Sequence, residues 1–116
     1  MTANSTIGTA GKLLRIFVDE EDRRQGKPLY AAIVDALRSA GFAGATVLKG
    51  IEGYGAHKMV HSARVFDFST NLPVVIEVFE QEEKVLAFIP TLREMMSEGL
   101  ITLENVQLLR VTQGKT

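Results

Sequence analysis

Leu13–Val18 (LLRIFV) is an almost unbroken apolar run that stops at the charged stretch Asp19–Arg24. Large and β-branched apolar residues in a run of this length predict a β-strand that leads into a loop. Both faces of this strand are apolar, because side chains alternate along it: Leu14, Ile16 and Val18 lie on one face, and Leu13, Arg15 and Phe17 lie on the other.

Outward from this strand, the hydrophobic periods predict five further elements. They are a helix from Gly26-Lys27-Pro28 to a stop at Gly41, strands over Ala45–Glu52 and Leu72–Phe79, a helix with its apolar stripe from Val85 to Met96 that closes at Gly99, and a strand over Ile101–Val111. Pro90 inside the second helix predicts a kink or a helix in two pieces. The order predicts an α+β domain of the ferredoxin-like βαββαβ kind, an antiparallel sheet with two helices on one face.

The composition narrows the class of protein. The chain of 116 residues has the size of one domain, and we expect a flexible N-terminal tail over residues 1–10 and a single domain over residues 11–113. It contains no cysteine, which excludes disulfides and thiolate metal sites. Thirteen basic and fourteen acidic residues provide no basic stripe, so no nucleic-acid partner is expected. With neither a signal peptide nor a membrane-spanning run in the sequence, we expect a cytoplasmic protein.

The sheet face away from the helices is predicted to be apolar. Leu13 and Phe17 share it with Val75 and Phe79, which lie on the corresponding face of the third strand. An apolar face that one chain leaves uncovered favours a symmetric oligomer in which subunits pack sheet against sheet. The alternative is a different register, in which these residues belong to one core.

The long connection after the second strand holds the first candidate binding residues. Gly53 and Gly55 would allow backbone N–H groups to approach a ligand, and Lys58 adds a positive charge, a combination that suits a phosphate or carboxylate. A turn with a solvated lysine is the structural alternative. Both histidines also lie here: His57 and His61 would share one face of a helical turn and could hold a metal, but solvated or hydrogen-bonded histidines are the favoured interpretation.

Two more cations are candidates for an anion site. Lys27 stands at the predicted start of the first helix, where free N–H groups favour an anion. Arg110 falls late in the predicted last strand, where it could hold a phosphate at a subunit interface or form an ordinary salt bridge. The chain offers no nucleophile with its base and no carboxylate pair with separate roles, so we expect no enzyme.

Several blocks together resemble a known family. They are Gly26-Lys27-Pro28-Leu29-Tyr30, Ala45-Thr46-Val47-Leu48-Lys49-Gly50, Gly53-Tyr54-Gly55-Ala56-His57 and Leu72-Pro73-Val74-Val75-Ile76-Glu77. In this order and spacing they resemble the prokaryotic family called domain of unknown function 190, a relative of the PII nitrogen-regulatory proteins, over about Gly11 to Val111. The resemblance implies a homotrimer of ferredoxin-like subunits. It also implies a signalling role, in which the segment 52–70, the counterpart of the PII T-loop, acts on a partner protein such as a membrane transporter or channel.

The PII resemblance also implies a ligand. Gly53, Gly55 and Lys58 match the start of the T-loop, whereas His57 replaces the glutamine that helps PII to bind magnesium and 2-oxoglutarate. The glycine-rich phosphate loop of PII has no counterpart in Ser97–Glu104, and Arg110 resembles one of two PII arginines. The resemblance therefore implies that AMP or ADP binds in a cleft between subunits, and it implies no firm cofactor. The alternative is a trimeric divalent-metal protein, similar to the cation-tolerance family, that uses His57 and His61.

Overall fold

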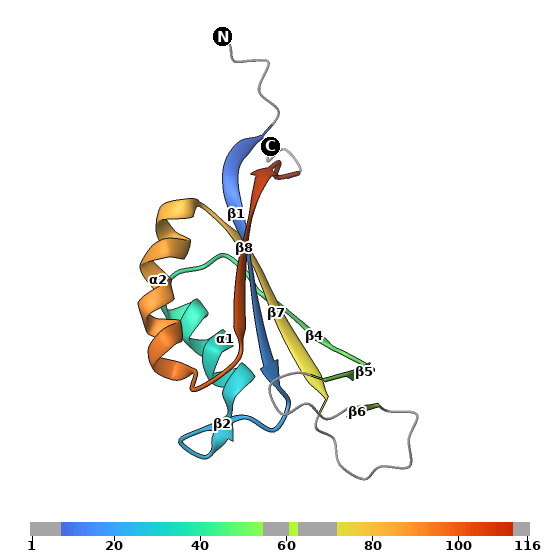
Figure 1. Ribbon diagram of the computed structural model, residues 1–116. Coiled ribbons are helices and arrows are strands. Elements are labelled where there is room, and N and C mark those ends of the chain that lie inside the picture. Colours follow the sequence, from blue (N-terminus) through green and yellow to red (C-terminus); the bar gives the residue numbers. More distant parts are fainter. Residues whose placement is uncertain (1–7, 55–60, 63–71, 113–116) are drawn as a thin grey trace.

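The computed structural model describes residues 8–54, 61–62 and 72–112 (Figure 1). Its elements in chain order are β1 (Thr9–Asp19), β2 (Arg23–Arg24), β3 (Lys27–Pro28), α1 (Leu29–Ser39), β4 (Thr46–Lys49), β5 (Glu52–Gly53), β6 (His61–Ser62), β7 (Pro73–Glu80), α2 (Glu82–Met95) and β8 (Leu100–Leu108). Four of these strands form one sheet in the order β4-β7-β1-β8, and every neighbouring pair in it is antiparallel.

Both helices cover the same face of this sheet, which Figure 1 shows nearly edge-on. The connection from β1 through α1 to β4 passes over β7, and the connection from β7 through α2 to β8 passes over β1, as in a split βαβ unit. The predicted α+β, ferredoxin-like βαββαβ fold is therefore confirmed.

The core lies between the sheet and the helices. The helix-facing residues of the central strands include Leu14, Ile16 and Ile76, all with no exposed surface. They meet Ile33 of α1 and Leu92 of α2, which are equally buried. Each such side chain contributes about 1.5–3 kcal/mol through removal from water. This packing confirms that Leu14, Ile16 and Val18 face the helices, as the alternation predicts.

The start of α1 differs from the prediction. A short hairpin, β2 to β3, precedes the helix and turns at Gln25 and Gly26, both with positive φ. Pro28 is the N-cap, so it precedes the helix instead of occupying its first turn. The chain extends here because the Leu29 N–H donates to the Asp22 carbonyl at 2.7 Å, which fixes the hairpin against the helix. The predicted stop at Gly41 is confirmed by its φ of +87°.

The second predicted strand, Ala45–Glu52, is divided in two. β4 pairs with β7, whereas β5 pairs with β6. The division falls beside Pro73, which has no N–H to continue the ladder and whose ring lies against Gly50: a Cβ at Gly50 would stand 2.7 Å from Pro73 Cγ. β5 therefore leaves the main sheet.

α2 runs from Glu82 to Met95 with Pro90 inside it, so of the two predicted outcomes, a kink or a helix in two pieces, the second is wrong. The cost of the missing hydrogen bond is offset by the burial of Val85, Phe88 and Leu92 on one stripe. The helix also ends before Gly99, because Met96 is already extended. Neither helix in the described parts of the chain is long and apolar enough to cross a membrane.

The outer ends of β1 and β8 extend past both helices (Figure 1). β1 begins at Thr9, which pairs with Leu108, so the sheet includes two residues before the predicted domain boundary at residue 11. β8 ends at Leu108, which leaves Arg110 outside the strand that was predicted to contain it.

Gly99 joins α2 to the sheet at a point where no side chain fits. Its φ is +137°, and a Cβ there would stand 2.6 Å from Met96 Cε and 2.7 Å from the Phe17 carbonyl oxygen. We expect Gly99→Ala to lower the free energy of unfolding by about 1–3 kcal/mol, since the backbone strain and the collision with Phe17 act together. Chemical denaturation measures this change.

Gly44→Ala is the matched control, because a Cβ at Gly44 meets no atom within 4 Å. We expect it to change stability little, or to raise it by about 0.4–1 kcal/mol by restricting the unfolded chain. Equal stability of the two variants would show that the Gly99 backbone carries no constraint.

Candidate functional site

The sheet face away from the helices is apolar, as predicted. Leu13 of β1 pairs with Phe79 of β7, and Phe17 pairs with Val75 on one side and with Leu100 on the other. Paired residues share a face, so these side chains form one patch, which we call the open face. Phe79 is 49% exposed and Leu100 is 56% exposed. Neither helix covers this surface.

A charged triad occupies the middle of the open face. Arg15 Nε donates to Glu77 Oε2 of β7, and its Nη1 donates to Glu104 Oε1 of β8, each at 2.9 Å. The hydrogen bond to Glu77 and the charge of Glu104 raise the pKa of Arg15 above its ordinary value. The alternation in the sequence puts Arg15 on this face, but only the register reveals its two partners. The triad ties three strands together across their ladders.

Of the long connection between β4 and β7, the structure describes residues 50–54, 61–62 and 72. Gly53 lies in β5 and pairs with His61 of β6. A Cβ at Gly53 would stand 2.9 Å from Pro73 Cγ, so this glycine permits a close approach of the proline ring. Tyr54, the next residue, is 74% exposed. The other predicted residues of this segment, Gly55, His57 and Lys58, lie outside the described residues.

Glu20 holds the two ends of this connection together, a role that the sequence does not indicate. Its Oε2 lies 2.7 Å from Lys49 Nζ, at the end of β4. Its backbone N–H donates to the Leu72 carbonyl at 2.9 Å, and its Oε1 accepts from the Leu72 N–H at 3.4 Å. The charge cluster after β1 is thus partly structural.

Lys27 lies one residue before Pro28, the N-cap of α1. It lies in β3, and its Nζ forms an ion pair with Asp35 of α1. The hydrogen bond from Lys27 lowers the pKa of the Asp35 carboxyl. Both groups are about half-exposed, so water screens the pair, and an anion would have to compete with Asp35 for this lysine.

Arg110 lies at the opposite end of the sheet from Gly53. The β1 ladder runs from Thr9, opposite Leu108, to Asp19, opposite Pro73, so the two ends are about 33 Å apart at roughly 3.3 Å per residue. Arg110 follows Leu108, whereas Gly53 contacts Pro73. One chain therefore does not bring these two predicted binding residues together.

The metal hypothesis gains no support from the described residues, among which no three His, Asp or Glu side chains cluster as a metal site. His61 is in a strand, so the shared helical face assumed for the two histidines does not apply at this position. His57 lies outside the described residues, which leaves the pair itself untested.

Comparison with known families and proteins matches most of the chain. The family model described as DUF190, Uncharacterized ACR, matches residues 11–108. A UPF0166 protein of Aquifex aeolicus is 39% identical over 98 residues, which cover 84% of this chain and 92% of that protein. A UPF0166 protein of Methanocaldococcus jannaschii is 37% identical over 100 residues, 85% of this chain and 92% of the relative.

Solved structures agree with the fold. A putative PII-like signaling protein from Thermus thermophilus superposes with a TM-score of 0.67 at 20% identity, over 90% of this chain and 94% of that one. CPII from Thiomonas intermedia, a nitrogen regulatory PII-like protein bound to ADP, AMP and bicarbonate, superposes with a TM-score of 0.62 at 22% identity, over 87% and 90% of the two chains. At these identities the likeness establishes the PII-like fold alone.

Proposed function

The chain belongs to the family called domain of unknown function 190 and has the PII-like fold, and from these two facts we propose that it is a homotrimeric regulatory protein and not an enzyme. Three copies pack through their open faces. AMP or ADP binds in the cleft between neighbouring subunits, and the segment 52–70 acts on a partner protein, such as a membrane transporter or channel, in the cytoplasm.

The open face is the observation that carries this proposal. Apolar side chains surround the Arg15 triad on a surface that neither helix covers. Apolar surface of this kind, on which Phe79 and Leu100 are exposed and Phe17 and Val75 are half-buried, marks an association site. A site that combines the Arg110 end with the Gly53 end needs two chains, because within one chain the two ends are about 33 Å apart.

The chemistry of the candidate residues favours a small nucleotide. CPII, which shares the fold, is described as bound to ADP and AMP. Arg110 is exposed here, and Lys58 can supply a second charge-assisted hydrogen bond to a phosphate. Only residues 96–99 join α2 to β8, and the one glycine among them, Gly99, lies against Phe17. This short link supports a site without a cradle for a third phosphate.

We expect a trimeric mass in solution and a monomeric mass for Phe17→Glu, because the substitution puts a charge in the middle of the open face. Light scattering after gel filtration measures both. Leu86→Glu is the matched control: Leu86 is an exposed apolar residue of α2, on the opposite side of the sheet. A monomeric wild-type protein at micromolar concentration would contradict the proposal.

Calorimetry on the trimer is expected to give tighter binding of AMP or ADP than of ATP, with or without magnesium. Lys58→Ala and Arg110→Ala should each weaken binding about tenfold or more, since a charge-assisted hydrogen bond contributes roughly 1.5–3 kcal/mol. If no nucleotide bound below millimolar concentration while zinc bound tightly and was lost in His57→Ala, the metal-binding alternative would replace this proposal.

Mixed trimers test whether the site is shared between chains. Lys58→Ala and Arg110→Ala chains are unfolded and refolded together in equal amounts. A native site then needs Lys58 from an Arg110→Ala chain and Arg110 from a neighbouring Lys58→Ala chain, which occurs at about a quarter of the inter-subunit sites. We expect that fraction of sites to regain wild-type affinity for the nucleotide.

Each variant refolded alone is the control and should regain nothing. Absence of recovery in the mixture, with trimers formed, would mean that both residues serve a site within one chain. This outcome is distinct from a failure of nucleotide binding altogether.

A further inference from the structure

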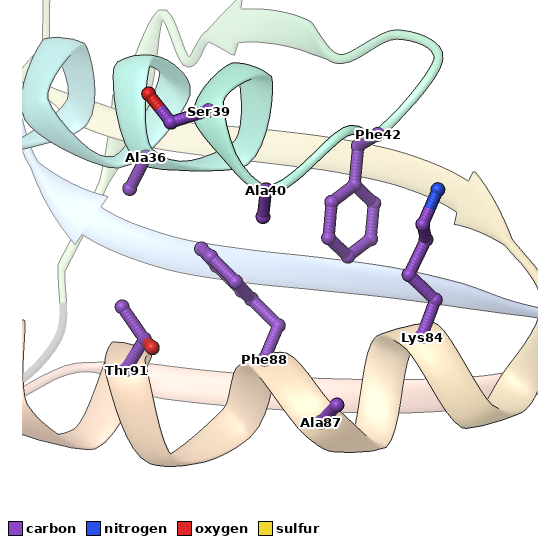
Figure 2. Close-up of a pocket in the computed structure, with 8 residues that line it drawn as sticks. All are labelled: Ala36, Ser39, Ala40, Phe42, Lys84, Ala87, Phe88 and Thr91. Atoms are coloured by element: carbon purple, nitrogen blue, oxygen red, sulfur yellow. The ribbon is translucent and has the colours of Figure 1, made fainter.

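A cavity of about 420 Å³ lies between α1 and α2, on the side of the helices away from the open face. Its lining is Ala36, Ser39, Ala40, Phe42, Lys84, Ala87, Phe88 and Thr91 (Figure 2). The volume is within the range of small-molecule sites, roughly 300–1,000 Å³. Assembly through the open face would leave this cavity accessible from solvent.

Small side chains create the space. Ala36 of α1 and Ala40, its C-cap, face Phe88 and Thr91 of α2 across the gap, as Figure 2 shows. The Phe42 and Phe88 rings meet edge to face, with their centroids 5.3 Å apart, and both side chains are buried. They form a firm apolar floor. The groove is therefore narrow, apolar at its base and closed toward the sheet.

Lys84 is the one charged residue in the lining. Its Nζ lies 5.5 Å from the centroid of the Phe42 ring and donates to the Gly41 carbonyl at 2.7 Å. Glu80 Oε2, which is nearly buried, forms an ion pair with this ammonium group at 4.0 Å but does not line the cavity. An ammonium group has three donors, so Lys84 keeps donors for a ligand after the bond to Gly41. Its position beside the groove is fixed by these contacts.

We propose that this groove binds a small aromatic monocarboxylate. The ring lies between the alanine methyl groups and the phenylalanine edges, which favour the face of another aromatic ring. The carboxylate accepts a hydrogen bond from Lys84 at one end of the groove, and Ser39 and Thr91 line the other end (Figure 2). A single positive charge at one end of an apolar slot selects a single negative charge at one end of the ligand.

A titration with 3-phenylpropionate, followed by amide chemical shifts, tests this site. We expect a Kd of about 1 mM or tighter, in the range of ligands of this size. The shifts should concentrate at Ala40, Phe42 and Ala87. 3-Phenylpropan-1-ol, which has the same ring without the charge, should bind at least about fivefold more weakly.

Two variants and a control separate binding at the groove from adsorption elsewhere. Ala87→Leu fills the groove from an exposed helix position that leucine suits, and it should abolish the shifts. Lys84→Gln should weaken binding at least about fivefold, whereas Arg93→Gln, a cation of the same helix outside the lining, should not. Because Lys84 also bonds to Gly41, Ala87→Leu is the decisive variant. Binding that survives Ala87→Leu, or no binding of 3-phenylpropionate at 10 times the expected Kd, would overturn the proposal.

Discussion

The rest of the structure depends on the pairing of β1 with two strands at once. From Lys12 to Phe17 each residue of β1 has a partner in both β7 and β8. This satisfies the backbone of the central strand on both edges, and both of its faces can then carry apolar side chains without exposing polar backbone groups. Leu14 and Ile16 become the floor on which both helices pack. Without β1, α1 and α2 would have no shared strand on which to pack.

The same strand determines what the second face can do. Each open face carries one guanidinium and two carboxylates, so the Arg15 triad has a net negative charge within an apolar surround. Covering it with another copy would remove water from these groups, and a charge out of water needs a complete set of hydrogen bonds. Apolar contact alone permits many relative orientations of two subunits, whereas the triad permits only those in which its charges keep their hydrogen bonds. The triad therefore favours one defined geometry of association.

The sequence predicts what depends on local patterning, and it misses what depends on distant contacts. Alternation along β1 was sufficient to predict both faces of the sheet, and the stripe of α2 was sufficient to predict its buried residues. The hairpin before α1 was missed because a hydrogen bond from Leu29 to Asp22 extends the chain there. The partners of Glu20 and Arg15, and the groove between the helices, involve residues more than 25 positions apart, for which a single sequence gives no period.

The two proposed sites would respond differently to the state of assembly. A ligand held by both the Gly53 end and the Arg110 end requires two chains, because the ladder of β1 keeps these ends apart within one. Such a ligand stabilises only the assembled protein, so its apparent affinity rises with protein concentration. The groove between α1 and α2 is complete within each chain and has no such dependence. It adjoins Phe42 and Phe88, which belong to the same core as β1, so a ligand there would stabilise the subunit itself. A ligand at the first site would therefore stabilise the assembly, and a ligand in the groove would stabilise the folded subunit whether or not it is assembled.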